Sequence, residues 1–274
     1  NDKLQLGYES DLPATQAFES IGFEGDSPET SSEQVVADKY SYTTCAITLA
    51  GGVKCLAGYD AGVLPVDIEG LDGSAPATTV VELIKASGFF CARLMTGAVK
   101  CWGNNYYGQL GDGAALGSSD PVPVPVSVIG LDGESESGSA VSISSGGFSA
   151  CAVTAQGEVR CWGISALPGE DGGPRENSSS PVILFGYEGT AADRFVQIEV
   201  QYTRTCGLTE GGAVKCWDPS QPELTEIPWL NGLSSETRVE KMSSYANYGF
   251  CAWLESGQVA CWDWFSNRTP LSPD

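Results

Sequence analysis

Hydrophobic positions along the chain show no sustained 3.6-residue period, so an amphipathic helix is not predicted in any long stretch. Short β-prone stretches are instead separated by turn-forming residues, with 34 glycines and 15 prolines in 274 residues. This pattern predicts an all-β protein built from many short strands.

The clearest elements are five segments in which two cysteines lie ten residues apart. A glycine follows the centre of each, so LAG, MTG, AQG, EGG and ESG predict three-residue hairpin loops that end in a residue with positive φ. In such a hairpin the two cysteines oppose each other at a non-hydrogen-bonded pair, where side chains approach most closely. The spacing therefore predicts five cross-strand disulfides: Cys45–Cys55, Cys91–Cys101, Cys151–Cys161, Cys206–Cys216 and Cys251–Cys261.

Metal ligation and free thiols are the alternatives to these disulfides. Each hairpin offers only two ligands, and the chain has no histidine, so zinc is disfavoured. A fully paired set indicates an oxidising compartment, and two glycosylation sequons, at Asn177 and Asn267, agree with secretion. In the chain-entropy model, each bridge would stabilise the fold by roughly 2–3 kcal/mol.

A second recurring feature lies between the hairpins, where Pro-containing stretches such as "LPVDI", "PVPVPVSV", "PVILF" and "PELTEIP" precede motifs such as "IEGLDG" and "VIGLDG". Proline donates no ladder hydrogen bond, so these stretches are predicted as exposed outermost strands. The hairpins recur every 45 to 60 residues, which is the size of a four-stranded propeller blade. We expect residues 1–274 to form a single β-propeller domain of five blades, in which the N-terminal segment 1–25 completes the last blade.

The segments "CARLMTGAVKCWGNNYYGQLGDG" (91–113) and "SISSGGFSACAVTAQGEVRCWG" (142–163) resemble the regulator of chromosome condensation repeat, in the cysteine-containing version of secreted bacterial proteins. This resemblance implies a β-propeller and says little about activity. The best-known members are seven-bladed, so a seven-bladed ring would apply if this chain were a fragment. The full G-Q-L-G occurs only at 108–111, and Leu56 stands where other repeats have tryptophan.

The net charge is −21, from 35 acidic and 14 basic residues. Such a surface repels nucleic acid and anionic membranes, and no apolar run is long enough to span a bilayer. We expect no cofactor, with calcium binding by acidic loops as the alternative. No signal peptide is recognised, so secretion or cell-surface display would make this a mature or excised form.

Catalytic groups are not evident in the sequence. Without histidine, Ser-His-Asp and Cys-His systems are excluded, and no glycine-rich loop opens a helix to hold phosphate. A glycosidase needs only two carboxylates, but no pair stands out among 35 acidic residues. The sequence therefore favours a protein that is not an enzyme.

Aromatic residues fall into two groups. Trp102, Trp162, Trp217 and Trp262 recur after the second cysteine and are predicted to pack between blades. Aromatic residues outside the repeat pattern are the candidates for ligand contact. These are Tyr106, Tyr107, Trp229, Trp264 and Phe265, although Trp229 could instead pack an outer strand and Trp264 could help to close the ring.

The resulting hypothesis is an extracellular, non-catalytic binding module, for example in adhesion, whose rigid loops bind a protein or a glycan. One alternative is a secreted inhibitor of a hydrolase, since the fold resembles propellers that inhibit β-lactamases. Another is a structural subunit that self-assembles edge to edge into a surface filament or layer. Nucleotide exchange and chromatin binding, as in nuclear relatives, are disfavoured by the cysteine pairs and the charge of −21.

Overall fold

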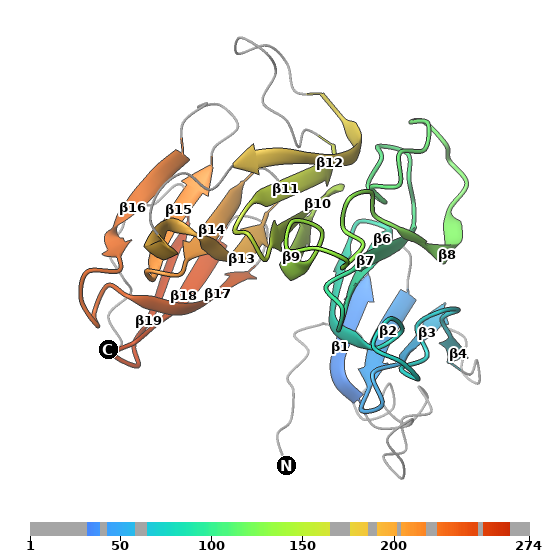
Figure 1. Ribbon diagram of the computed structural model, residues 1–274, viewed down its shortest axis with the longest axis horizontal. Coiled ribbons are helices and arrows are strands. Elements are labelled where there is room, and N and C mark those ends of the chain that lie inside the picture. Colours follow the sequence, from blue (N-terminus) through green and yellow to red (C-terminus); the bar gives the residue numbers. More distant parts are fainter. Residues whose placement is uncertain are drawn as a thin grey trace, which may run out of the picture.

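The computed structural model describes residues 32–38, 43–57, 65–164, 176–185, 191–201, 204–217, 224–245 and 249–263. This part is all-β, as predicted; its one helical element is the short 3₁₀ turn η2 (Ala191–Asp193). The strands form five antiparallel sheets, here called blades 1 to 5 (Figure 1). They are β1 (Ser32–Asp38), β2 (Thr43–Thr48), β3 (Val53–Ala57) and β4 (Val66–Asp67) in blade 1; β5 (Val80–Ala86), β6 (Phe89–Leu94), β7 (Val99–Gly103) and β8 (Val122–Ser127) in blade 2; β9 (Ala140–Gly146), β10 (Ser149–Thr154), β11 (Val159–Gly163) and β12 (Ser178–Phe185) in blade 3; β13 (Phe195–Val200), β14 (Thr205–Thr209), β15 (Ala213–Trp217) and β16 (Leu224–Asn231) in blade 4; and β17 (Val239–Tyr245), β18 (Gly249–Leu254) and β19 (Val259–Asp263) in blade 5.

The blades follow one another in an arc, as in a β-propeller (Figure 1). In each blade the strands are hydrogen-bonded in chain order, and the first strand packs against the first strand of the next blade. These inner strands join as β1–β5, β5–β9, β9–β13 and β13–β17, and the described residues show no comparable packing of β17 on β1. Blade 5 has three described strands, and the N-terminal segment expected to complete it lies outside the described residues.

The five cysteine hairpins form as the spacing predicted. The cysteines of each pair are direct partners in the register, with Cα atoms 4.0–4.1 Å apart, and all five disulfides are present. Thr48 donates its backbone N–H to Gly52 O (2.9 Å), which closes a three-residue loop of the predicted type. The loop glycines have φ between 80° and 86°, so the left-handed position is used in every hairpin: Gly51, Gly97, Gly157, Gly212 and Gly257.

The Pro-containing stretches form the outer strands, which confirms the second prediction. β4, β8, β12 and β16 each lie at the edge of a sheet and pair only with the second strand of the preceding cysteine hairpin. In β8, Pro123 is exposed and Pro125 is half-buried, so the missing N–H groups lie at an edge where no further strand requires them.

The recurring G-L-D-G motif holds the connection between blades against the hairpin turn. Its leucine is fully buried in three repeats, at Leu71, Leu131 and Leu230. Asp72 Oδ1 accepts the backbone N–H of Ser74 (2.9 Å), and this hydrogen bond, with others from Thr78 and Ser74 side chains, lowers the pKa of Asp72 to about 2. The motif is therefore a structural element of the repeat.

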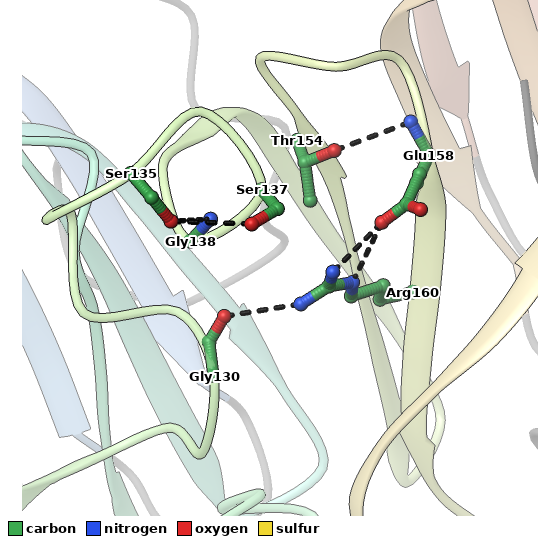
Figure 2. Close-up of polar contacts among 7 residues, drawn as sticks. All are labelled: Gly130, Ser135, Ser137, Gly138, Thr154, Glu158 and Arg160. Carbon is green, nitrogen blue, oxygen red and sulfur yellow. Dashed lines mark hydrogen bonds and ion pairs between the residues drawn. The ribbon is translucent and has the colours of Figure 1, made fainter.

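Arg160 reinforces the connection between blades 2 and 3 (Figure 2). Its Nη2 lies 2.7 Å from Glu158 Oε2 on the same hairpin, and its Nη1 donates to Gly130 O (3.1 Å) in the connection. Further along this connection, the backbone N–H of Gly138 donates to Ser135 Oγ (3.0 Å). These polar groups satisfy one another, so their evident role is to fix the connection.

The hydrophobic core lies between blades. Each disulfide of blades 1 to 4 faces the next blade, and blades 2 and 3 meet in a cluster that contains the Cys91–Cys101 pair, Leu110 and Trp162. The four repeat tryptophans are buried, with 0–8% of their surface exposed, as the sequence predicted: Trp102, Trp162, Trp217 and Trp262. Fully burying a large apolar side chain contributes about 1.5–3 kcal/mol, so each tryptophan adds substantially to the packing at its junction.

Candidate interaction site at the Tyr106 loop

The loop between β7 and β8, residues 104–117 and here called the Tyr106 loop, is held from within by amide side chains. Asn105 is 3% exposed; its Nδ2 donates to Asp112 Oδ1 (3.1 Å) and its Oδ1 accepts the Leu110 N–H (3.1 Å). Gln109 is fully buried, and its Oε1 accepts the Tyr107 N–H (2.7 Å). Because these bonds satisfy buried polar groups, they fix one loop conformation.

The same loop docks on blade 3. Trp162 donates its indole N–H to Gln109 O (2.9 Å), and Gly113 donates its N–H to Ser179 O (2.7 Å). Gly108 has φ of +80°, and a Cβ there would lie 2.6 Å from Ser179 Cα, so only glycine fits this approach. The G-Q-L-G sequence at 108–111 therefore specifies a junction between the loop and blade 3.

An aromatic patch lies on this rigid loop. Tyr106 is 47% exposed and meets Tyr107 edge to face, with ring centroids 4.9 Å apart; Tyr107 in turn lies 5.1 Å from Phe148 in the turn before β10. Leu116 is 48% exposed, and the Gly117 N–H donates to Tyr106 O (2.8 Å), which ties both ends of the loop together. We call Tyr106, Tyr107, Leu116 and Phe148 the aromatic patch.

The structure brings together two of the five aromatic candidates. Tyr106 and Tyr107 are in contact in the aromatic patch. Trp229 lies on the outer strand β16 in another blade, half-buried and 5.6 Å edge to face from Trp262, so it packs the outer strand instead of joining the patch. Trp264 and Phe265 lie outside the described residues.

Two members of the patch were not predicted from the sequence. Leu116 could have been found, because it is a large apolar residue inside a glycine- and serine-rich loop. Phe148 could not be assigned, because its contact with Tyr107 depends on how blade 3 packs beside blade 2. Of the two sequons, Asn177 is exposed just before β12, and Asn267 lies outside the described residues.

Two half-buried carboxyl groups lie on the inner strands. Glu82 Oε2 pairs with Arg93 Nε (2.7 Å) and accepts the Ile143 N–H (3.3 Å) of the next blade. Burial raises the pKa of Glu82 and that of Glu199, and the charge of Glu82 raises the pKa of Glu199 further. Glu199 accepts a hydrogen bond from Gln197 Nε2 (3.1 Å). Glu82 therefore links the inner strands of blades 2 and 3, whereas the Gln197 bond of Glu199 lies within β13.

The described residues contain no group of three or more acidic, cysteine or histidine side chains placed to hold a metal ion. Calcium binding therefore stays a prediction. No helix in the described part is long and apolar enough to cross a membrane.

The fold and the site define the class of protein: a β-propeller of disulfide-braced repeats that carries an aromatic patch on one loop between strands. Residues 96–153 match the regulator of chromosome condensation (RCC1) repeat. The match identifies an RCC1-type repeat in this part of the chain, and the solved structures described next show an RCC1-like β-propeller fold.

Solved structures share the fold at low sequence identity. Human WBSCR16 is 17% identical, with a TM-score of 0.66 over 85% of this chain and 61% of that one. Yeast RCC1 (Prp20), solved with Kap60, is 13% identical, with a TM-score of 0.61 over 85% and 56%. Prp20p from Saccharomyces cerevisiae, in a study of its binding to Gsp1p and histones, is 15% identical, with a TM-score of 0.59 over 85% and 58%.

These likenesses show the fold alone, and this chain matches about three-fifths of the length of each neighbour. No curated protein sequence matches this chain closely enough to be called a relative.

Proposed function

We propose that this chain is a non-catalytic interaction module of an oxidising, extracellular environment, and that the aromatic patch on the Tyr106 loop binds a protein or glycan surface. The observation that carries this proposal is the exposure of Tyr106 and Leu116 on a loop fixed by buried hydrogen bonds and docked on blade 3. A loop already held in one conformation loses little entropy when it binds, and exposed tyrosines are frequent hot-spot residues.

Further support comes from the five disulfides, which fit an oxidising compartment. The net charge of −21 argues against nucleic-acid partners. Yeast RCC1, a fold neighbour, has been solved bound to the protein Kap60, which illustrates that this fold can present a protein-binding surface. The partner itself is not transferable at 13% identity.

The experiment compares wild type with the double variant Tyr106→Ser, Leu116→Ser on a glycan array and against immobilised extracellular proteins, with and without calcium. The matched control is Val124→Ser, which removes an equally exposed apolar side chain (45%) from the outer strand β8 of the same blade. We expect the double variant to lose at least about tenfold in affinity and the control to retain it, because truncating a hot spot costs more than about 1.4 kcal/mol. Equal binding by all three proteins would contradict the assignment of the patch.

A further inference from the structure

The four junctions between consecutive blades share one layout. The face of a blade that carries its disulfide, here called the Cys face, packs against the opposite face of the next blade, here called the receiving face. On the Cys face, the valine two residues before the second cysteine is 0–1% exposed in blades 1 to 4: Val53, Val99, Val159 and Val214. On the receiving face, one inner-strand residue is 0–2% exposed in blades 2 to 5: Leu83, Ile143, Ile198 and Met242.

Hydrogen bonds from equivalent positions cross the same junctions. Gln34 Nε2 donates to Leu83 O (2.8 Å), and Gln197 Nε2 donates to Met242 O (2.7 Å). The two remaining junctions use an acceptor at this position: Glu82 accepts the Ile143 N–H, and Ser142 accepts the Ile198 N–H (3.3 Å). The fifth equivalent residue is Lys241, which is exposed.

The Cys face of blade 5 is the exception to this burial. Val259, the fifth equivalent valine, is 49% exposed. Trp253 is 54% exposed, whereas its aliphatic equivalents Ile47, Val153 and Leu208 are 0–3% exposed. In blade 2 the equivalent residue is Arg93, which is half-buried in an ion pair with Glu82. Cys251 and Cys261 are half-buried, and the other eight cysteines are 0–5% exposed. An apolar surface with an exposed tryptophan at its centre is typical of an interaction site.

The receiving face of blade 1 is less buried than the receiving faces of blades 2 to 5. Val35 is half-buried at the position where Leu83 and its three equivalents are buried. Leu56 is half-buried at the position of the four buried repeat tryptophans. Ala46, itself 1% exposed, is the small residue found in the same place as Ala92, Ala152 and Ala252. Blade 1 thus carries the kind of surface that covers a Cys face elsewhere in the chain.

We propose that the Cys face of blade 5 binds the receiving face of blade 1 in a second copy of this chain, as a fifth junction formed head to tail. Within one chain the two faces lie at opposite ends of the arc (Figure 1). Four packed and hydrogen-bonded junctions fix that arc, so bringing the faces together within one chain requires repacking them, and a second copy does not. At two junctions, Gln34 and Gln197 donate to a backbone carbonyl of the next blade. At the proposed junction, Lys241 would donate in the same way to the carbonyl of Val35 in the second copy, because a lysine side chain can only donate.

The net charge of −21 opposes association of two copies, so salt should strengthen it by screening the repulsion. A head-to-tail contact uses two different surfaces, and each surface can be disabled separately. Sedimentation velocity over a concentration series at low and high salt is therefore the assay, with Trp253→Asp for the Cys face and Val35→Asp for the receiving face. Leu56→Glu is the second receiving-face variant if Val35→Asp fails to fold, and Val124→Asp is the control.

Wild type and Val124→Asp are expected to show species above 28.7 kDa as concentration and salt rise. Trp253→Asp and Val35→Asp should each weaken association by about tenfold or more. An equimolar mixture of the two variants should recover a dimer, because one intact Cys face meets one intact receiving face. A wild type that stays monomeric at all concentrations overturns the proposal, as does a receiving-face variant that associates like wild type.

Discussion

Trp162 of blade 3 donates its indole N–H to the backbone carbonyl of Gln109 of blade 2 over 2.9 Å, in a setting where both residues are fully buried. The bond joins the core between blades to the loop that carries the aromatic patch. The packing between blades therefore supports the candidate site, and a change at Trp162 should alter the conformation of the Tyr106 loop.

The change Trp162→Phe removes the donor and leaves the Gln109 carbonyl without this bond. We expect a loss of about 1–3 kcal/mol in the free energy of unfolding for an unpaired buried group, in addition to lost packing. Urea unfolding measures the loss, and hydrogen exchange of the Tyr107 and Leu110 N–H groups reports the loop. Trp102→Phe is the control, since Trp102 packs by stacking on Phe90 with centroids 5.6 Å apart. An equal response of the loop in both variants would contradict the coupling.

Disulfide removal should cost different amounts in blades 3 and 5. The loops have equal length, so the chain-entropy model gives each about 2–3 kcal/mol. The pair Cys151–Cys161 is buried at 2%, and replacing it with two serines also buries hydroxyl groups, whereas Cys251–Cys261 is half-buried. At low protein concentration, the double serine variant of blade 3 should therefore unfold at lower urea. The reverse order would show that blade 3 does not bury its bridge.

Glu199 should make stability fall as pH rises. Burial raises its pKa in the folded state, so the folded state holds the proton more tightly than the unfolded chain. Its destabilising effect is absent below the unfolded pKa and fully developed above the raised folded pKa. Glu199→Gln should raise Tm at pH 7 and have little effect near pH 4. A larger gain at pH 4 than at pH 7 would contradict a raised pKa.

Asp72 should have the opposite effect on the pH dependence of stability, and it serves as the control for Glu199. Its pKa is lowered to about 2, chiefly by the Ser74 N–H, so its contribution is present above the ordinary value of 3.8 and is lost as pH falls towards 2. Asp72→Asn keeps an acceptor for this turn, as Asn231 does for Leu233 in a later repeat (3.1 Å). The variant should lose the pH dependence below pH 4 and keep the fold.

Gly108→Ala should displace the Tyr106 loop from blade 3, because the new Cβ would lie 2.6 Å from Ser179 Cα and 2.8 Å from Ser178 O. Gly117→Ala is the matched control in the same loop: it also has positive φ (+92°), but nothing lies within 4 Å of its Cβ. We expect the control to cost about 1 kcal/mol of conformational energy and the Gly108 variant clearly more, with loss of ligand binding. Equal unfolding curves would refute the docking.

The hairpins and outer strands could be predicted because their signals are local. A ten-residue cysteine spacing with glycine after the centre specifies a loop, and proline marks an edge. The inner strands could not be located in the same way. Their polar residues Gln34, Ser142 and Gln197 carry no local signal of their role, and only the structure shows that they bond to the backbone of the next blade.

Only part of the candidate site could be predicted from the sequence, for the same reason. Tyr106 and Tyr107 stand out as adjacent aromatic residues in a turn sequence. Phe148 and the docking role of Gly108 arise from the approach of two blades, which no local pattern encodes. Trp229 shows the converse, since an aromatic residue outside the repeat pattern can still belong to the core, here against Trp262.

Five bridges that each stay within one hairpin are the central feature of this fold, and non-reducing peptide mapping by mass spectrometry with trypsin and Glu-C tests them directly. Trypsin cleaves between the two cysteines of four hairpins, at Lys54, Lys100, Arg160 and Lys215, and Glu-C cleaves between those of blade 5, at Glu255. Glu-C also cleaves after Glu134 and so separates Cys101 from Cys151, which trypsin alone would leave in one peptide. The expected result is five linked peptide pairs that join Cys45 to Cys55, Cys91 to Cys101, Cys151 to Cys161, Cys206 to Cys216 and Cys251 to Cys261. Peptides linked between different hairpins, or cysteines that alkylate in the native protein, would contradict it.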